Sequence, residues 1–334
     1  MSDKKSQPLA IGKLDSELLK EIVFEKLDYR RDEVLTRPGI GEDCAVIDYG
    51  EYECVLSTDP ITASIEDIGH LAVHISCNDV ASNGIQPVGL MLAVMLPEGT
   101  TQEDIEKMME QAGEASRELG VEIIGGHTEI TTAVKQPLMV STAVGRAPKG
   151  RSQAAKDMAE GDAIIVTKQI GLEGTGIIAK EKDLSGFLTE DEIVAAKQMI
   201  DQVSVVREGV IAGDIGTHGM HDVTEGGILG AVWEMCHISG MGAEIDEDSI
   251  PMDPVTEKIC SHFGADPLRM ISSGCMLIVC PGESRDEMIM KIRSSGVMAT
   301  CIGRITGRGE SVRFSDGRII DPPGADEIYR VLDS

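Results

Sequence analysis

The sequence has few aromatic residues and lacks long apolar runs. Aromatic residues make up 3% of its 334 residues, so the cores must be built from Val, Ile, Leu, Ala and the 17 Met. No run of about 18 apolar residues occurs, which excludes a transmembrane helix. The first residues, Met1–Lys5, lead into a polar stretch without the apolar segment of an export signal.

Paired metal-binding cysteines are missing as well. None of the eight cysteines forms a CxxC pair, and several lie in apolar runs such as Ser273–Cys280. Buried, reduced thiols explain this distribution better than disulfides or zinc ligands. We therefore expect a cytoplasmic protein with no membrane attachment.

Basic residues are outnumbered by acidic ones. The chain has 30 Lys and Arg against 57 Asp and Glu, a net charge of −27. This charge repels a phosphate backbone, so we expect no nucleic-acid partner. Most of the acidic side chains are expected to be solvated surface groups.

The familiar nucleotide-binding motifs are also absent, since neither GxxxxGK(S/T) nor GxGxxG occurs. The first 130 residues instead contain four acidic or amide-bearing clusters beside glycines or predicted strands. Mg²⁺ takes several oxygen ligands, and glycine loops let backbone N–H groups approach phosphate oxygens. The clusters therefore indicate an enzyme that uses a nucleotide. They are Gly39–Asp43, Ser57–Pro60, Asn78–Asp79 and Gly125–Glu129.

Length and patterning predict two domains. A chain of 334 residues is longer than one core usually supports. The segment Gly145–Gly161 has no apolar run, and a strand pattern resumes at Ala163–Thr167. We predict domains at residues 1–150 and 151–334, each alternating strands and helices as in α/β or α+β proteins.

Apolar spacing predicts the individual elements. The predicted helix at Ile68–Asn83 is rich in small residues, so we expect it to pack closely against other elements. Helices are also predicted at Asp15–Leu27, Gln102–Leu119, Glu190–Met199, Gly226–Ser239 and Ala325–Leu332. Strands are predicted at Cys44–Ile47, Glu53–Ser57, Pro87–Met95, Val121–Ile124, Leu138–Val144, Ala163–Thr167, Cys275–Cys280 and Ala299–Ile305.

The first two clusters border predicted strands. Gly39–Asp43 is interpreted as a tight turn that directs Asp43 at a metal, or alternatively as an acidic surface turn. Asp59 lies where a strand is predicted to end, because Pro60 has no N–H to donate. An Asx turn before the proline is the alternative for Asp59.

The third cluster lies within a predicted helix. His74 and Asn78 are four residues apart and share a face, with Asp79 next to them. Asn and Asp compete for backbone hydrogen bonds in helices, so this pair in an apolar helix indicates function. His74 itself is interpreted as a hydrogen-bonded core histidine.

Two double glycines complete the pattern. Gly125-Gly126 follows a predicted strand, beside Thr128 and Glu129. We expect the two glycines to form a bend with exposed amides; a simple turn is the alternative. Gly226-Gly227 follows His221–Glu225 and opens a predicted helix. Unpaired N–H groups at such a helix start suit an anion.

Taken in order, these motifs resemble the superfamily of aminoimidazole ribonucleotide synthetase, selenophosphate synthetase, thiamine-monophosphate kinase and the hydrogenase-maturation protein HypE. The resemblance runs from Gly39–Asp43 to Ser272–Cys275 and covers nearly the whole chain. It implies that the N-terminal sheet pairs with that of a second subunit into a barrel, and that ATP lies in clefts along this homodimer.

The resemblance also implies a set of site residues. Magnesium would be bound by Asp43, Asp59 and Asp79, with Glu129 added to this set. ATP would be contacted by Asn78, Gly125, Gly126, His127 and Thr128. Gly226 and Gly227 belong to a loop that would face the second substrate, and His221 and Asp222 would contact or deprotonate that acceptor.

Gly12–Leu14, Gly41–Asp43 and Gly126–Glu129 look most like the HypE-related branch. HypE ends in a cysteine that receives a carbamoyl group, whereas the last cysteine here is Cys301. We therefore expect a freely diffusing small-molecule acceptor and no covalent adduct on the protein. A maturation partner protein is a further expectation from this branch.

The predicted function is ATP-dependent activation, in which an acceptor oxygen attacks the γ-phosphate of ATP while magnesium offsets the developing charge. One alternative is a kinase resembling thiamine-monophosphate kinase, which would transfer phosphate and stop there. Another is a scaffold that binds nucleotide and docks on a maturation partner without turnover.

Overall fold

The computed structural model describes residues 9, 14, 16–39, 41–62, 65–153 and 157–332. Four residues named in the sequence motifs, Gly12, Lys13, Asp15 and Ile40, lie outside the described residues. Within the described ranges, no helix has the length and apolar content needed to cross a membrane.

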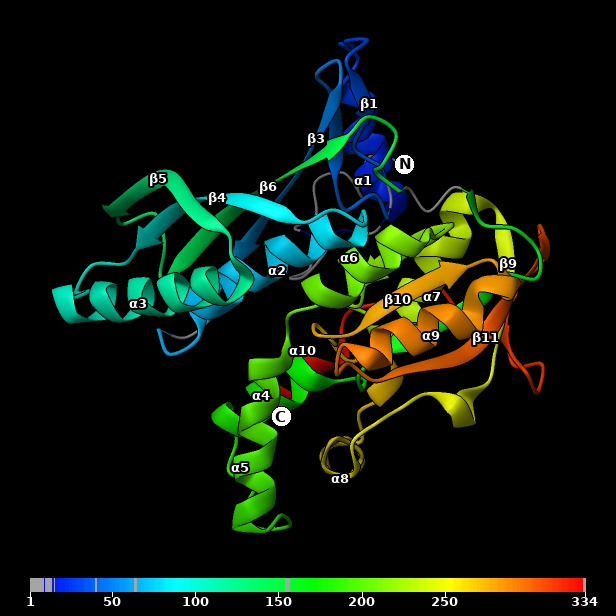
Figure 1. Cartoon of the computed structure of the whole chain (residues 1–334). Helices are drawn as coiled ribbons and strands as arrows, with labels where there is room; N and C mark the ends of the chain where they lie inside the picture. Colours follow the sequence, from blue (N-terminus) through cyan, green and yellow to red (C-terminus); the bar gives the residue numbers. More distant parts are fainter. Residues whose placement is uncertain are drawn as a thin grey trace, which may run out of the picture.

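The first sheet contains six strands in the order β1-β2-β3-β6-β4-β5. Neighbouring strands are antiparallel except β4 and β5, which are parallel. Figure 1 shows this sheet in one lobe of the molecule, with β5 at its outer edge. Its strands are β1 (Val34–Thr36), β2 (Ala45–Asp48), β3 (Tyr52–Ile61), β4 (Pro87–Leu96), β5 (Glu122–Ile130) and β6 (Leu138–Pro148).

The second sheet also has six strands, in the order β12-β9-β11-β7-β10-β8. All residues of β7 and β10 are buried. The reason is that α6 and α9 pack on one face of the sheet and α7 on the other. Strands covered on both faces read as continuous apolar runs. The strands are β7 (Ala163–Thr167), β8 (Gly219–Asp222), β9 (Met241–Ile245), β10 (Met276–Cys280), β11 (Ala299–Arg308) and β12 (Val312–Phe314).

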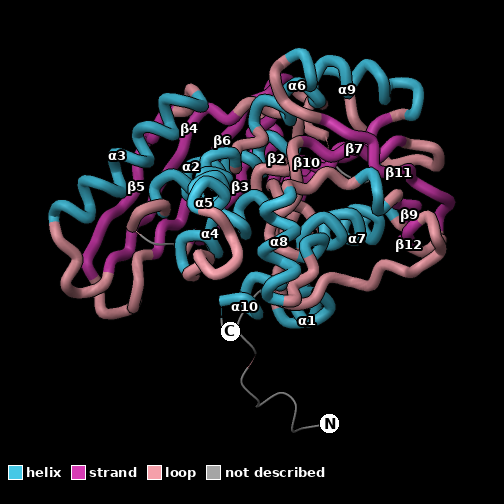
Figure 2. Tube along the Cα trace, turned by 90° about the horizontal axis from the view of Figure 1, so that it is seen from below, coloured by secondary structure: helices cyan, strands magenta, loops and turns pink. Residues whose placement is uncertain are grey.

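The chain is thus a mixed α/β protein with two sheet-containing domains. Its helices are seen from below in Figure 2, where α2 and α3 cross the first sheet. The helices are α1 (Ser16–Ile22), α2 (Ile68–Ser82), α3 (Gln102–Leu119), α4 (Leu172–Glu181), α5 (Glu190–Gln198), α6 (Val206–Ile215), α7 (Gly227–Ser239), α8 (Pro254–Phe263), α9 (Arg285–Ser294) and α10 (Glu327–Leu332). The predicted helix at Asp15–Leu27 is shorter in the structure, since a 3₁₀ turn at Phe24–Lys26 follows α1.

Helix α2 lies between the two domains. Every residue of it except His70 is buried. It packs against α3, β3 and β6 of the first domain and against α6 and β8 of the second. A Cβ on Gly69 would come within 2.0 Å of the Met108 carbonyl oxygen, so the helices approach more closely than a larger residue permits. The close packing predicted from its small residues is confirmed.

Two predicted strand ends are wrong. Strand β3 continues through Pro60 to Ile61. Strand β2 stops opposite Leu56. Beyond that point one edge of β3 has no partner strand, so Pro60, which has no N–H to donate, is tolerated there.

Strand β5 likewise continues through Gly125 and Gly126, which do not form the predicted bend. The register with β4 shifts at Ile124, as in a β-bulge. A Cβ on Gly126 would lie 1.9 Å from the Leu92 carbonyl oxygen, so the glycine permits close pairing with β4.

Candidate active site

A cleft of about 1310 Å³ lies between the two domains. One wall comes from β2, β3 and one face of α2, and the other from α4, residues 222–225 and 271–273, and α10. Five aspartates line it. Asp67 pairs with Lys180, and the other four come from different elements: Asp43 precedes β2, Asp59 lies in β3, Asp79 in α2 and Asp222 at the end of β8. They meet because α2 packs on both β3 and β8.

Serine hydroxyls orient two of these aspartates. Ser57 donates its hydroxyl hydrogen to Oδ2 of Asp79, and Ser76 donates to Oδ2 of Asp59 at 3.1 Å. Asp222 Oδ2 is buried without a hydrogen-bond partner among the described residues. The cleft therefore holds at least one carboxylate oxygen that still requires a partner.

The charges of neighbouring aspartates raise the pKa values of Asp79 and Asp222. Burial, followed by the charges of Asp222, Asp59 and Asp43, raises the pKa of Asp79 well above its usual value. Burial and the charge of Asp43 raise the pKa of Asp222 to about 7, against the opposing effect of His221. Like charges held this closely favour a bound cation. One side-chain atom each from Asp43, His221 and Asp222 lie within 4.8 Å of one another, so His221 is close enough to these two carboxylates to interact with their charge.

His221 lies behind the aspartates and does not line the cleft. Its Nε2 is 3.6 Å from Asp43 Oδ1 and 3.4 Å from Glu234 Oε2, and its Nδ1 donates to the Asp222 carbonyl oxygen at 2.6 Å. Burial lowers the pKa of His221, but Asp43, Glu234 and Asp222 outweigh that effect and raise it to about 10. The imidazole is thus a buried cation that offsets the aspartate charge, and its predicted contact with the acceptor stays a prediction.

Asn78 connects the two domains. Its Nδ2 donates to the Val203 carbonyl oxygen at 2.7 Å, and its Oδ1 accepts the Val205 N–H at 2.8 Å. Both ends of the side chain are therefore occupied by the segment that leads into α6. The predicted contact of Asn78 with ATP stays a prediction.

The cluster at 125–129 is not brought to the aspartates within one chain. Gly125, Gly126, His127, Thr128 and Glu129 lie on the exposed edge strand β5, and none of them lines the cleft. His127 Nε2 lies 3.2 Å from Glu129 Oε2 on the surface.

The backbone N–H groups of Gly226 and Gly227 are hydrogen-bonded within the protein. Gly226 and Gly227 have φ of 85° and 62° at the start of α7. The Gly226 N–H donates to Asp326 Oδ2 at 2.7 Å, and the Gly227 N–H donates to the Thr224 carbonyl oxygen at 3.1 Å. Their predicted contact with a substrate therefore stays a prediction, since both N–H groups stabilise the local fold.

His74 is buried as predicted, but the predicted hydrogen bonding is wrong. Neither ring nitrogen has a hydrogen-bond partner among the described residues. Burial lowers the pKa of His74 to about 3, so the ring is neutral. It packs on His70 between α2 and α3, with ring centroids 4.3 Å apart.

Several residues of the site were not predicted. Glu234 could have been recognised from the sequence, because its carboxylate interrupts the mostly apolar helix Gly227–Ser239. Ser57 and Ser76 could not have been recognised from the sequence, since serines are common on strands and helices of every kind. Glu173 and Ser273 also line the cleft. Ser273 lies in the motif Ser272–Cys275, for which the sequence predicts no role in the site, and no motif surrounds Glu173.

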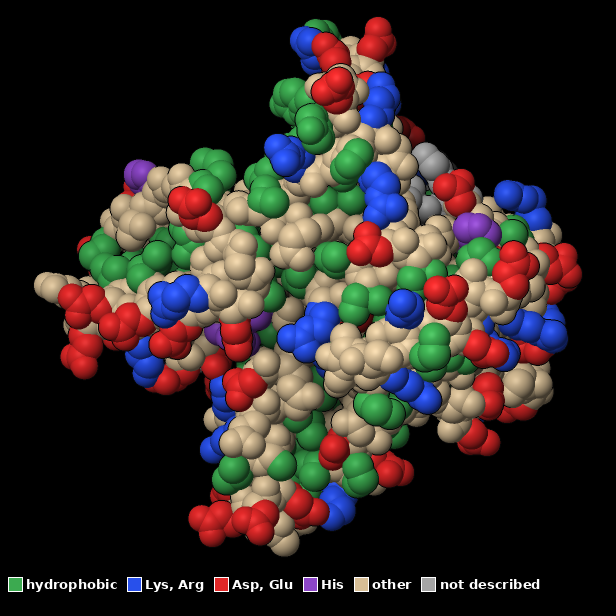
Figure 3. All heavy atoms as spheres, in the orientation of Figure 1, with side chains coloured by type: hydrophobic (Ala, Val, Ile, Leu, Met, Phe, Trp, Pro, Cys, Tyr) green, Lys and Arg blue, Asp and Glu red, His purple; other side chains and the backbone are tan. Residues whose placement is uncertain are grey.

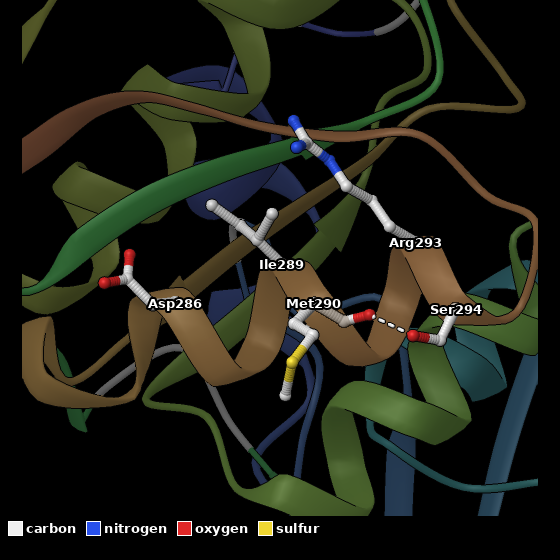
Figure 4. Close-up of a pocket in the computed structure, with 5 residues that line it drawn as sticks. All are labelled: Asp286, Ile289, Met290, Arg293 and Ser294. Atoms are coloured by element: carbon white, nitrogen blue, oxygen red, sulfur yellow. Dashed lines mark hydrogen bonds between the residues drawn. The ribbon is translucent and has the colours of Figure 1, made fainter.

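A smaller hollow of about 490 Å³ lies on the outer face of α9 (Figure 4). It is lined by one helix only, through Asp286, Ile289, Met290, Arg293 and Ser294. Ser294 donates its hydroxyl to the Met290 carbonyl oxygen at 2.7 Å. No convergent set of charges faces this hollow, so the acidic cleft is the candidate site.

Comparison with known proteins identifies the family. The N-terminal domain of the AIR synthase related proteins matches residues 41–147, and the C-terminal domain of the same family matches residues 159–315. A hydrogenase expression/formation protein of Methanocaldococcus jannaschii is 32% identical, over 96% of this chain and 97% of that protein. Carbamoyl dehydratase HypE of Rhizobium leguminosarum bv. viciae is also 32% identical, over 79% of this chain and 77% of its own.

Solved structures share the fold at lower identity. HypE in a HypE–HypF complex has a TM-score of 0.76 and 23% identity, over 92% of this chain and 99% of that chain. HypE in complex with ATP has a TM-score of 0.71 and 22% identity, over 96% and 98%. Thiamine monophosphate kinase of Aquifex aeolicus has a TM-score of 0.70 and 18% identity, over 92% and 97%.

The resemblance inferred from the ordered motifs is confirmed by these matches. Both halves of the chain match domains of one family, and the M. jannaschii relative extends over nearly its whole length. The chain belongs to the AIR synthase related protein family, as an enzyme with HypE and hydrogenase expression/formation proteins among its relatives.

Proposed function

We propose that the chain is an ATP-dependent enzyme in which an oxygen of a small-molecule acceptor attacks the γ-phosphate of ATP. The observation that carries this proposal is the meeting of four aspartates from both domains in one cleft, with Asp222 Oδ2 lacking a partner among the described residues. The relative named carbamoyl dehydratase and the fold shared with a HypE–ATP complex support it.

Magnesium fits this donor set. Asp43, Asp59 and Asp79 offer carboxylate oxygens from three elements, as Mg²⁺ requires. When bound, the metal would offset the charge of the phosphates and polarise them towards attack. Ser57 and Ser76 hold two of the carboxylates in place, and His221 keeps its proton between Asp43 and Glu234. Asp222 would contact the acceptor from the opposite wall.

The acceptor is proposed to be a free small molecule because the described part of the chain offers no suitable thiol in the cleft. Cys44 is the cysteine that lines it, and its thiol donates to the Asp79 carbonyl oxygen at 3.2 Å. Burial and the neighbouring aspartates raise the pKa of Cys44 well above its usual value. A protonated, buried thiol is a poor nucleophile.

Product analysis tests the reaction. Incubation with Mg·ATP and a metabolite panel, followed by phosphorus NMR, is expected to give ADP and free phosphate with one acceptor class. ADP with a phosphorylated acceptor would favour the kinase, an alternative supported by the shared fold with thiamine monophosphate kinase. Binding of Mg·ATP without turnover of any acceptor would contradict the proposal and favour the scaffold.

A homodimer is part of the proposal. Helices α2 and α3 cover one face of the first sheet, while Val88 and Met91 of β4 remain about half exposed at 50% and 49%. Figure 3 shows hydrophobic side chains on this lobe. The edge strand β5 has unpaired backbone groups and exposed Ile124 and Ile130. We propose that this sheet forms a barrel with that of a second copy, which would bring residues 125–129 to a nucleotide shared between the subunits.

The double variant Ile124→Glu/Ile130→Glu is expected to convert a dimer into a monomer. Each buried Ile stabilises by roughly 1.5–3 kcal/mol, so two per subunit would change the dissociation constant by at least about a thousandfold. Light scattering after size exclusion at micromolar concentration measures the mass. Val194→Glu on α5 is the control, since Val194 is similarly exposed, at 50% against 56% for Ile124 and 54% for Ile130, but lies away from this sheet. A monomeric wild type would refute the dimer.

Docking on a maturation partner and a cytoplasmic location complete the proposal. The fold shared with HypE in its complex with HypF supports a protein partner. The eight free cysteines, six of them buried, are compatible with a reducing compartment.

A further inference from the structure

The wall of the cleft that the second domain forms contains a carboxyl group, that of Glu173, to which the proposed mechanism assigns no role. Glu173 lies in the first turn of α4, and Ser273 lies just before β10. Both line the cleft, and their side chains are buried, with exposed fractions of 7% and 0%. Glu173 Oε2 and Ser273 Oγ have no hydrogen-bond partner among the described residues. Two buried polar atoms thus face the same cleft unsatisfied.

The neighbouring carboxylates, by contrast, are satisfied within the protein. Asp326 accepts three backbone N–H groups, from Gly226, Ile271 and Ile328, at 2.7, 3.1 and 2.8 Å. Glu225 Oε1 accepts the Tyr329 hydroxyl at 2.8 Å. Glu173 Oε2, in contrast, has no partner within hydrogen-bond distance among the described residues. Leaving a buried carboxylate oxygen unsatisfied is costly for a folded protein, so this oxygen can accept a hydrogen bond from outside.

The surroundings of Glu173 are negative. Burial raises the pKa of Glu173 to about 7, and the charges of Asp326 and Glu225 add to this effect, while Ser273 opposes it. The lysines farther along the same wall already have acceptors, since Lys180 pairs with Asp67 and Lys182 donates to the Leu332 carbonyl oxygen. An anionic group would be repelled at Glu173, and a cationic group would be attracted.

Apolar side chains lie beside this polar pair. Ile177 follows Glu173 by one turn of α4, and Ile200 and Ile271 line the same cleft. A short hydrocarbon chain would therefore find apolar contacts once its polar end had reached Glu173. The subsite combines one charged end with an apolar wall, which is typical of small-molecule sites.

We propose that Glu173 and Ser273 form the subsite for the acceptor, and that they select an acceptor with a protonated amine on a short apolar stem. The inference rests on the proposed function, because it names the class of acceptor for the same cleft. An ammonium group has three N–H donors, which suit Glu173 Oε2 and Ser273 Oγ together. A hydrogen bond between two ionised groups is stronger than one to a neutral amide.

Three probes of similar shape test this selection: butylammonium, butyramide and butyrate. Each is titrated into the full chain in the presence of Mg·ADP, and binding is followed by ligand-observed NMR. Butylammonium is expected to bind at least about tenfold more tightly than butyramide, and butyrate not at all, because ionised hydrogen bonds are roughly twice as strong as neutral ones. Glu173→Gln is expected to reduce the affinity for butylammonium to that for butyramide, and Ser273→Ala to reduce it less.

Glu287→Gln on the exposed face of α9 is the matched control and should leave the affinity for butylammonium unchanged. Equal binding of the three probes, or full butylammonium affinity in folded Glu173→Gln, would overturn the proposal. If Glu173→Gln does not fold, the order of the three probes on the wild type decides alone. If the chain did not bind Mg·ATP but still selected butylammonium, only the proposed function would be refuted. If it bound Mg·ATP but did not distinguish the three probes, only this inference would be refuted.

Discussion

Asp59→Asn and Asp79→Asn are each expected to abolish magnesium-dependent ATP binding while the fold stays intact. Each substitution removes one carboxylate from a cluster in which Asp43, Asp59, Asp79 and Asp222 line one cleft. Charge stabilisation by a bound metal is on the order of several kcal/mol, so the affinity for Mg·ATP should fall by roughly a hundredfold or more. Calorimetric titration with Mg·ATP measures this loss.

The same variants should be no less stable than the wild type in the absence of metal. Burial and the charges of the other aspartates disfavour ionised Asp79, so a neutral amide relieves repulsion. The amide oxygen that Asp79→Asn introduces can still accept the Ser57 hydroxyl. Asp286→Asn, exposed on α9, is the control and should bind Mg·ATP normally. Unchanged affinity for Mg·ATP in both Asp59→Asn and Asp79→Asn would show that the metal assignment is wrong.

Lys168→Met is expected to lower the free energy of unfolding by about 3–5 kcal/mol, the usual cost of breaking a buried ion pair from one side. Lys168 Nζ lies 2.6 Å from Glu208 Oε1 and also donates to the carbonyl oxygens of Ser204 and Gly274, at 2.6 and 2.7 Å. The Glu208 side chain is 1% exposed, so the substitution leaves a buried carboxylate without its cation. Urea denaturation followed by circular dichroism measures the change.

Lys149→Met provides the comparison for Lys168→Met. Lys149 pairs with Asp48 on the surface, where water and salt screen the charges, so little change in unfolding is expected. The double variant Lys168→Met/Glu208→Leu should recover part of the loss, because neither charge then remains buried. If the two single lysine variants unfolded at the same urea concentration, the buried pair would not have the stabilising role assigned to it.

Local sequence signals predict the bounds of some elements correctly. They fail where contacts with distant strands decide where an element ends. The predicted helix at Gln102–Leu119 agrees with α3, because Thr101 and Asp104 form a capping box and Gly120 ends the helix at φ 66°. Pro60 and Gly126 are locally typical of strand ends. Both nevertheless lie inside strands, because β2 stops early beside one and β4 approaches closely beside the other.

The candidate site could be predicted only in part for the same reason. Asp43, Asp59, Asp79 and Asp222 stand out in the sequence, and the structure places all four in one cleft. Their partners cannot be predicted, because contacts such as Ser57 with Asp79 join residues that are far apart in the chain. Glu173 and Ser273 are a similar case, since their unsatisfied atoms become apparent only once α4 packs against residues 270–274, which precede β10.

The position of α2 limits how the enzyme can move during turnover. A hinge between two domains requires a connection with few contacts, whereas α2 is in the core of both and is tied to the second domain by Asn78. Rotation of one domain against the other would expose this helix and separate Asp79 from Asp222. We therefore expect substrate entry and product release to depend on local displacement of α4 and α10, which form one wall of the cleft, while the aspartate geometry stays fixed.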